Sequence, residues 1–247
     1  MTAETLNDRM KYYYEEVTKT RLVRRMPVVI RLDGRSFHNF TKGFARPTDE
    51  VFVKAMNRTM EYLCGNIQGC KIGYTQSDEI TLILTDYDKL TTDAWFDYEI
   101  QKLCSIAASM ATLAFNRAFN NAVIEYKDKE DADPSLMKAY SRASMMGATF
   151  DARCFNIPKE EVTNVLWWRQ LDCMNNSLLR LAQMHFTQDE LNGKGRTQMG
   201  HMLKEIGVAP AQELGYVWFG SFKEAKPCWA FFSNGLMIKP IREVIML

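Results

Sequence analysis

The sequence of 247 residues predicts an α+β fold, in which a ferredoxin-like βαββαβ domain is followed by additional helices and strands. Two observations predict this class. Segments with strand and helix periods alternate in the first half of the chain, in the order of a split βαβ sheet: strand, helix, strand, strand, helix, strand. The hydrophobic residues, 47% of the total, are also enough to build a substantial core.

The first strand is the apolar run from Val28 to Asp33, and a polar helix over Thr5 to Lys19 precedes it. Glycines and a proline predict a loop over residues 34–47. Thr48 or Asp49 is then expected to cap a helix that ends at Cys64. The apolar face of this helix would be Val51, Phe52, Ala55, Met56, Met60 and Leu63.

Two strands are expected next, over Cys70 to Thr75 and over Glu79 to Thr85, with a tight hairpin between them. A long and largely buried helix should follow over Thr92 to Asn120, because its apolar residues spread widely around the cylinder. A strand over Ala148 to Phe155 completes the series. Polymerase palm domains have this arrangement.

The second half is less regular. The charged run from Glu125 to Pro134 is interpreted as a surface loop, and Pro158 begins a helix that continues towards Phe186. A loop with glycine and lysine, Asn192 to Arg196, comes next. The stretches GYVWF and CWAFF resemble strands whose pairing the sequence does not specify.

These patterns predict a palm-like catalytic domain with an N-terminal helix over residues 1–157. Residues 158–247 would form a helical and mixed part packed on it, in one compact body. The six cysteines show no metal-finger spacing, and the chain has neither an apolar signal core nor a membrane-length apolar run. We therefore expect a cytoplasmic protein with free thiols.

The net charge of +1 conceals a basic segment between Arg21 and Arg46, in which Asp33 is the single acid. A polyanion such as RNA could bind there through phosphate contacts, although the charge alone is better explained by a solvated surface. The candidate RNA-binding residues are Arg21, Arg24, Arg25, Lys42 and Arg46, together with Lys194 and Arg196 in the later loop.

Carboxylates follow two of the predicted strands. Asp33 ends the first strand, and Asp78 with Glu79 lies at the hairpin between the second and third. In a split βαβ sheet these segments can be neighbours, so the acids could meet at one edge and would repel one another without a cation. Alternatively, Asp33 and Asp78 are ordinary turn residues, because Asp-Gly and Ser-Asp are common in turns.

Magnesium suits such a site, because it takes oxygen ligands and commonly combines one or two carboxylates with substrate phosphates. Two ions about 4 Å apart can activate an attacking hydroxyl and stabilise the leaving oxygen of a phosphoryl transfer. The expected ligands are Asp33, Asp78 and the backbone carbonyl of Gly34, with Glu79 as a third acid on the opposite face of its strand.

The residues around these acids suit a nucleotide. The backbone N–H groups of Gly34, Arg35, Ser36 and Phe37 could hold triphosphate oxygens, while His38 and Phe44 could flank a purine ring. Ser77 could contact a phosphate or cap its turn, and Lys102 could neutralise a second triphosphate. Each also has a structural alternative: Phe37 as a core residue, His38 and Lys102 as exposed surface residues.

Three blocks resemble the tRNA-His guanylyltransferase family, the reverse (3′-to-5′) RNA polymerases. They are Asp33 to Phe40 (DGRSFHNF), Gln76 to Glu79 (QSDE) and Trp168 to Cys173 (WRQLDC), in the order of the family. The similarity extends from about Pro27 to about Leu203.

The resemblance implies two magnesium ions, ATP and GTP as substrates, and nucleotide addition to the 5′ end of a tRNA, by a homo-oligomer that would be a tetramer. It places Asp33, Gly34 and Asp78 on the metals, with Ser77 and Glu79 in support. It assigns nucleotide binding to Gly34 to Phe37 with His38, Phe44 and Lys102.

The departures from the family point to one branch. Where members that guanylate tRNA-His have a His-Ile-Asn-Asn-Leu-Tyr-Asn block, this chain has Met174 to Arg180 (MNNSLLR), and Glu99 replaces an arginine one turn before Lys102. The block Met174 to Arg180, together with His185-Phe186 and the stretch Glu190 to Lys194 (ELNGK), resembles the bacterial-type, guanylyltransferase-like branch. That branch is associated with template-dependent repair of 5′-truncated tRNA.

Two other functions stay open at this point. A nucleotidyl cyclase or dinucleotide synthase on a related palm needs the same acids but no long RNA. A noncatalytic RNA-binding module would use the acids only to shape turns.

Overall fold

The structure, a computed structural model, describes residues 5–208, 216–219 and 226–227. Its strands are β1 (Val28–Gly34), β2 (Cys70–Gln76), β3 (Glu79–Leu84), β4 (Phe150–Asn156), β5 (Tyr216–Phe219) and β6 (Lys226–Pro227). Its α-helices are α1 (Leu6–Met10), α2 (Phe37–Phe40), α3 (Glu50–Asn66), α4 (Ile100–Lys127), α5 (Pro134–Met146), α6 (Val162–His185), α7 (Gln188–Leu191) and α8 (Arg196–Glu205). Short π-helical or 3-10 turns cover η1 (Lys11–Glu15), η2 (Glu16–Thr18), η3 (Trp95–Tyr98) and η4 (Lys159–Glu161).

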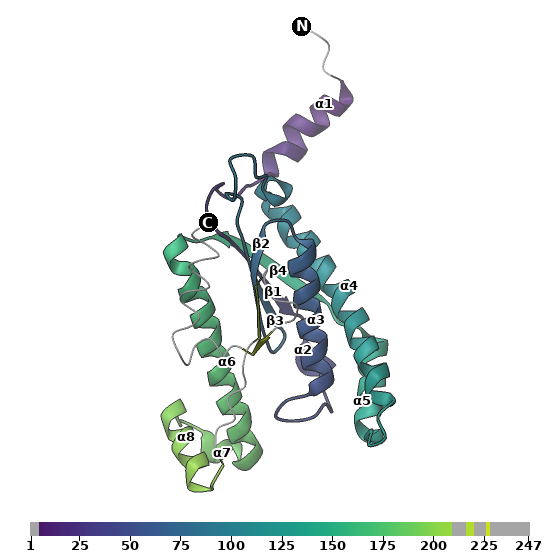
Figure 1. The fold of residues 1–247 in the computed structure, drawn as a ribbon, viewed down its shortest axis with the longest axis vertical. Helices are drawn as coiled ribbons and strands as arrows, with labels where there is room; N and C mark the ends of the chain where they lie inside the picture. The colour runs from purple at the N-terminus through teal and green to yellow at the C-terminus, as the bar shows by residue number, and fades with distance from the viewer. Residues whose placement is uncertain (1–4, 209–215, 220–225, 228–247) are drawn as a thin grey trace.

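The strands form one antiparallel sheet, whose first four members lie in the order β4-β1-β3-β2 and which β5 and β6 extend beyond β2. Helices α3 and α4 cover one face of the sheet, and α6 lies against the other (Figure 1). The predicted α+β class is therefore confirmed, with a four-stranded antiparallel sheet at its centre.

The position of β1 between two partners fixes its register at both edges. Residue Val28 lies opposite Leu84 of β3, and Asp33 lies opposite Glu79 at the other end of the same pair. On its second edge, Gly34 lies opposite Phe150 of β4. The C-terminal end of β1 therefore lies beside the β2–β3 hairpin.

One large core fills the space between the sheet and the helices α3 and α4. Alternate β1 residues, Val28, Ile30 and Leu32, are fully buried there, as strand alternation requires. Aromatic rings from α2, from the loop after it and from α4 complete this core, where Phe44 stacks on Phe119 with centroids 5.7 Å apart. The core thus supports the segment that follows β1.

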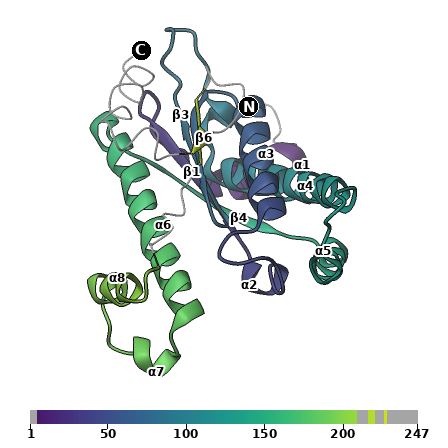
Figure 2. The ribbon, with the colours of Figure 1, turned by 60° about the horizontal axis from the view of Figure 1, so that its bottom comes forward.

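Polar anchors hold α6 on the opposite face of the sheet. The hydroxyl of Tyr74 on β2 donates to Gln170 Oε1 at 3.1 Å, and Arg169 pairs with Glu79 of β3. Beyond the sheet, α7 and α8 fold back on the far end of α6 around a small apolar cluster (Figure 2): Leu181, Ala182, Leu191 and Leu203.

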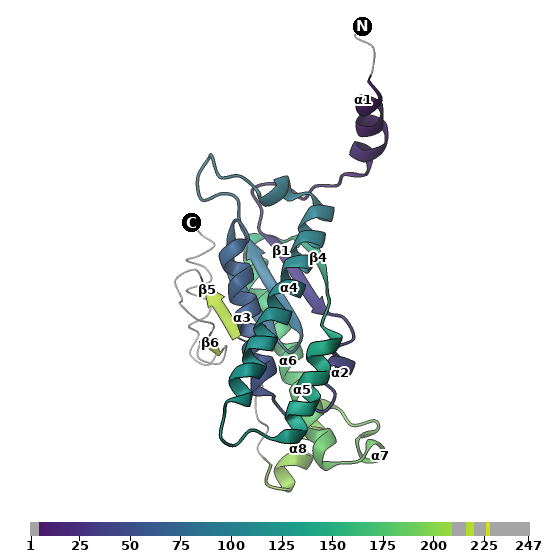
Figure 3. The same cartoon turned by 90° about the vertical axis from the view of Figure 1, so that its right-hand side faces the viewer.

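Most predicted elements are present with small shifts at their ends. The N-terminal helix, Leu6 to Thr18 through α1, η1 and η2, projects away from the sheet (Figure 3). Helix α3 has the predicted N-cap, because the side chain of Asp49 accepts from the N–H of Phe52 at 2.9 Å. The stretch GYVWF contains β5, whereas CWAFF lies outside the described residues.

Three predictions of local structure were wrong. The helix expected from Thr92 begins at Ile100, because Phe96, Asp97 and Tyr98 adopt positive φ angles and turn the chain at η3. The loop expected over residues 34–47 contains α2.

The third error concerns the charged run, read as a loop, which lies partly within helices. Helix α4 extends to Lys127, and Asp133 caps α5 by accepting from the N–H of Ser135 at 2.8 Å. The division of the chain at residue 157 stays a prediction. None of the helices in the described ranges is long and apolar enough to cross a membrane.

Candidate active site

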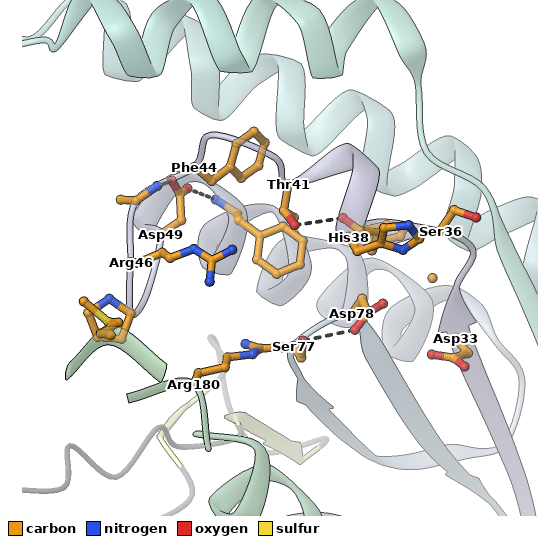
Figure 4. A pocket seen from close by; sticks show the side chains of 16 residues that line it. Asp33, Ser36, His38, Thr41, Phe44, Arg46, Asp49, Ser77, Asp78 and Arg180 are labelled. Carbon is orange, nitrogen blue, oxygen red and sulfur yellow. Dashed lines mark hydrogen bonds between the residues drawn. The ribbon is translucent and has the colours of Figure 1, made fainter. Parts of the chain in front are cut away.

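Two turns meet at the edge of the sheet where β1 ends. The N–H of Gly34 donates to the carbonyl oxygen of Asp78 at 3.0 Å, which joins the end of β1 to the β2–β3 hairpin. Asp33 and Asp78 consequently line the same pocket (Figure 4). The structure therefore brings together the two carboxylates that the sequence places 45 positions apart in the chain.

The electrostatic environment of Asp78 disfavours its charged form. Burial raises the pKa of Asp78 above its ordinary value, and the negative charge of Asp33 adds to the rise. The hydroxyl of Ser77 opposes it by donating to Asp78 Oδ1 at 3.0 Å. A cation between the two acids would offset this cost.

The pocket beside these acids has a volume of about 460 Å³. Four segments line it: the end of β1 with α2, the loop and start of α3, the β2–β3 hairpin, and α6. Its lining residues are Asp33, Gly34, Ser36, Phe37, His38, Thr41, Phe44, Ala45, Arg46, Pro47, Asp49, Phe52, Ser77, Asp78, Arg180 and Met184. This volume lies within the range of small-molecule sites in proteins.

Two of the four backbone N–H groups predicted to bind phosphate are already hydrogen-bonded within the protein. The N–H of Gly34 bonds to Asp78, and the N–H of Arg35 donates to the carbonyl of Thr149 at 2.9 Å. Any backbone cradle for a phosphate must therefore be formed by Ser36, Phe37 and His38. Ser36 has a left-handed conformation, with φ at 57°, and reverses the chain into α2.

Gly34 is required by the packing of Phe37. A Cβ atom at position 34 would lie 2.3 Å from Cδ2 of the Phe37 ring, which is only 4% exposed. The ring cannot easily retreat, because Phe115 and Phe150 pack against it with centroids 5.4 and 5.2 Å away. The absence of a side chain at position 34 thus lets the turn lie directly on the core.

We expect Gly34→Ala to lower the free energy of unfolding by about 1–3 kcal/mol, because the added methyl group overpacks this site. Chemical denaturation measures the change. Gly200→Ala on α8 is the matched control: a Cβ there has open space, so the variant should match or exceed wild-type stability. Equal stability of the Gly34→Ala variant and the wild type would show that the ring and the turn relax together at no cost.

The predicted base-binding pair is divided between surface and core. His38 is exposed at the pocket. Phe44 is only 7% exposed, because its ring packs on Phe119 and meets Tyr140 edge-on. Phe44 therefore offers only a small part of its ring to the pocket.

The structure does not bring every predicted site residue to the pocket. Arg35 is exposed and does not line it. Lys102 also lies outside the pocket, at the start of α4, where its Nζ is 3.8 Å from Glu99 Oε2. The carboxylate of Glu79 is held by Arg169 on α6, at 2.6 and 2.8 Å. Burial raises the pKa of Glu79, and Arg169 opposes the rise. The roles of these residues in the reaction stay predictions.

The basic segment of the sequence does not form one surface. Arg24 pairs with Asp86 at 2.5 Å and Arg21 with Asp97 at 2.9 Å, beside the N-terminal end of β1. Arg25 donates to the carbonyl of Leu90 there. Arg46 instead lines the pocket at the C-terminal end of β1. Strand β1 separates the two groups by roughly 20 Å, so they form two separate patches, and binding of RNA to either stays a prediction.

The remaining basic residues of the prediction are exposed. Lys42 lies in the loop between α2 and α3, and Lys194 lies between α7 and α8. Arg196 donates to Asn175 Oδ1 on α6. RNA binding by these residues stays a prediction.

Arg180 is a pocket residue that the sequence argument did not select. Its Nη2 donates to Ser77 Oγ at 3.0 Å, so α6 reaches the hairpin beside Asp78. The residue stands at the end of the block in which this chain departs from the tRNA-His guanylyltransferase pattern. That departure was the one available signal, because contact between positions 77 and 180 depends on how α6 is placed.

Comparison with known proteins gives a consistent picture. The family model described as tRNAHis guanylyltransferase matches residues 7–158. An uncharacterized protein of Acanthamoeba polyphaga mimivirus is 31% identical over 82% of this chain and 70% of its own length. The tRNA(His) guanylyltransferase of Schizosaccharomyces pombe is 27% identical over 86% of this chain and 73% of its own. The matching region spans 54% of the probable enzyme from Dictyostelium discoideum and 45% of the human one, about half their length.

Solved structures extend the similarity over nearly the whole chain. A bacterial tRNA(His) guanylyltransferase-like protein in complex with ATP has a TM-score of 0.79 and 33% identity, over 98% of this chain and 100% of that one. A structure of such a protein with GTP gives a TM-score of 0.76 and 32% identity, over 98% and 99%. The chain therefore belongs to the tRNAHis guanylyltransferase family of tRNA 5′-end nucleotidyltransferases.

Proposed function

We propose that this chain adds nucleotides in the 3′-to-5′ direction to the 5′ end of tRNA, as a repair of 5′-truncated molecules that uses the tRNA itself as template. The observation that carries the proposal is the pair Asp33 and Asp78 in a pocket large enough for a nucleotide, in a chain similar to proteins described with ATP and GTP. The departure of Met174 to Arg180 from the guanylating members favours repair over a single guanylate addition.

The fold supports a palm-like role for the sheet. The order β4-β1-β3-β2, with α3 between β1 and β2 and with α4 and α5 between β3 and β4, agrees with a ferredoxin-like palm. In such a sheet the end of β1 and the β2–β3 hairpin form one edge. The acids would therefore act from a rigid edge of the sheet.

The donor set fits magnesium. Asp33, Asp78 and the Gly34 carbonyl offer only oxygen, and the two carboxylates lie close enough for the charge of Asp33 to raise the pKa of Asp78. Among the described residues no group of three or more histidine, cysteine or acidic side chains could hold a metal. Magnesium commonly completes its coordination with water and substrate phosphates. Bound there, magnesium would neutralise charge on the reacting phosphates and lower the pKa of the attacking hydroxyl.

The reaction would proceed in two displacements at phosphorus. A 5′-phosphate oxygen of the tRNA attacks the α-phosphorus of ATP, and pyrophosphate leaves. The 3′-hydroxyl of GTP or of another paired nucleotide then loses its proton and attacks the 5′-phosphorus, and AMP leaves. An RNA with a 5′-triphosphate would need only the second step, with pyrophosphate as the leaving group. Orientation and charge neutralisation supply most of such catalysis, so no side-chain nucleophile is needed.

The decisive experiment incubates a 5′-truncated tRNA with ATP, GTP and magnesium and sizes its 5′ end. Extension by the number of residues that the opposite strand templates supports repair. Addition of a single guanylate whatever the template would overturn the repair function but keep the transferase. Cyclic or dinucleotide products from ATP or GTP without tRNA would instead favour a cyclase or synthase. RNA binding without any product would leave only a binding module.

A further inference from the structure

A stripe of α6 residues faces the sheet and continues beyond its edge. Arg169, Cys173 and Ser177 are all buried on this stripe. Arg180 lies about three helical turns after Arg169 and therefore points in nearly the same direction. At Arg180 the sheet has ended and the stripe meets the pocket, where Met184 follows one turn later. The packing of α6 thus determines where the Arg180 side chain lies.

The guanidinium of Arg180 is exposed, yet it is held in one place. Its Nη2 donates to Ser77 Oγ at 3.0 Å, and the same hydroxyl donates to Asp78 Oδ1 at 3.0 Å. Figure 4 shows the side chain reaching from α6 to the hairpin at the side of the pocket. The positive charge of Arg180 also lowers the pKa of Asp78, so the guanidinium acts on this carboxylate as well as on Ser77.

The charges of the pocket are separated along its length. Asp33 and Asp78 lie together at one side, while Arg46 and Arg180 lie towards the other (Figure 4). Asp49 also lines the pocket, but its carboxylate accepts from the N–H groups of Ala45 and Phe52 and from the hydroxyl of Tyr140. Those three bonds hold it in a structural role. The pocket therefore has an acidic part and a basic part.

On the basis of the proposed function, we propose that Arg180 is a phosphate-binding residue, which holds the β- and γ-phosphates of the nucleoside triphosphate while the reacting α-phosphate lies beside Asp33 and Asp78. A guanidinium can donate up to five hydrogen bonds in a planar fork, so contacts with Ser77 and with a phosphate oxygen are compatible. Pyrophosphate leaves from this end in the first displacement, and Arg180 would stabilise its growing negative charge.

The competing explanation makes Arg180 only a brace between α6 and the hairpin. A brace would matter equally for every ligand of the pocket, whereas a phosphate-binding residue matters in proportion to the phosphates that the ligand carries. The comparison of ATP with AMP separates the two, because both have the same base and sugar.

The test measures equilibrium binding of ATP and of AMP, each with magnesium, to the full chain. Arg180→Ala should weaken ATP binding about 10- to 100-fold, the loss expected for a charge-assisted hydrogen bond, and leave AMP binding within about twofold. Arg180→Lys should recover part of the loss, because it keeps the charge without the fork. Arg117→Ala removes an exposed arginine of α4 outside the pocket, and both affinities should equal those of the wild type.

Equal weakening of ATP and AMP in the Arg180→Ala variant, or no change in either, would overturn the assignment. Thermal unfolding of the variant should stay close to that of the wild type, because the side chain is exposed; a large loss of stability would favour the brace. Wild-type protein that binds neither nucleotide and extends no tRNA would refute the proposed function itself, and the assignment of Arg180 with it. Wild-type extension with an unchanged ATP preference in Arg180→Ala would refute the assignment alone.

Discussion

Asp33→Asn and Asp78→Asn are each expected to lower the rate of 5′-nucleotide addition by about 10³-fold or more. Asparagine keeps the size and packing of the side chain but removes the negative charge on which the proposed chemistry at this edge of the sheet depends. Single-turnover extension of a 5′-truncated tRNA measures the loss. Binding of the tRNA should stay near the wild-type value, because phosphate contacts elsewhere supply it.

The stability of the same variants distinguishes a chemical defect from unfolding. The charge of Asp33 raises the pKa of Asp78, so the two carboxylates repel one another in the protein without a cation. Asp33→Asn should therefore match or exceed wild-type stability, by up to about 1 kcal/mol. Full activity in both variants would refute the active-site assignment. Loss of activity with loss of folding would leave the acids with a structural role only.

Arg169→Ala is expected to lower the free energy of unfolding by about 3–5 kcal/mol, the usual cost of removing one partner of a buried ion pair. Arg169 and Glu79 are 7% and 8% exposed and share two hydrogen bonds. Arg31 Nε is 4.0 Å from Glu79 Oε2, too far to replace them. Denaturant titration measures the change. As a control, Lys54→Ala breaks an ion pair with Glu125 whose side chains are 47% and 44% exposed, and should cost less than about 1 kcal/mol.

The pH dependence of the Arg169→Ala defect has a definite sign. Burial already raises the pKa of Glu79 above its ordinary value of 4.5, so the folded protein holds this proton more tightly than the unfolded chain. Protonation of Glu79 stabilises the protein fully when the pH is below the pKa of Glu79 in the unfolded chain. This stabilisation is lost as the pH rises through the pKa of Glu79 in the folded protein. Removal of Arg169 raises the folded pKa further. The deficit should therefore be larger at about pH 8 than at about pH 5, and a deficit independent of pH would contradict the burial of a charged Glu79.

The sequence predicts those parts of the fold in which local pattern and tertiary structure agree. The apolar period of α3 and the capping side chain of Asp49 both indicate the same helix start, and the apolar run before Asp33 indicates β1. Helix α5 has a start signal in Asp133-Pro134, but this signal lies at the end of a charged run that is typical of a surface loop. The delayed start of α4 had no clear signal, because Phe96 and Tyr98 are bulky residues that seldom adopt positive φ.

Some features of the candidate site could likewise be predicted from the sequence, and others could not. The meeting of Asp33 and Asp78 follows from strand order, which the alternation of periods indicates. A linear charge run does not give the separation of Arg24 from Arg46, whereas the strand predicted between them does, because its length places the two residues near opposite ends. The contribution of Arg180 depends on the seating of α6, which rests on the specific pairing of Arg169 with Glu79.

The two sides of the pocket are expected to differ in local stability, because Asp33 lies on an interior strand of the sheet and Arg180 lies on helix α6. Because β1 is bonded along both edges, its amide protons should exchange with solvent only when the whole domain opens. Asp33 is thus preorganised before any ligand arrives. Arg180 belongs to a helix that lies on the sheet through side chains, so its amides should exchange by smaller local openings. The sheet would then fix the position of the catalytic carboxylate, while small movements of α6 would accommodate different nucleotides.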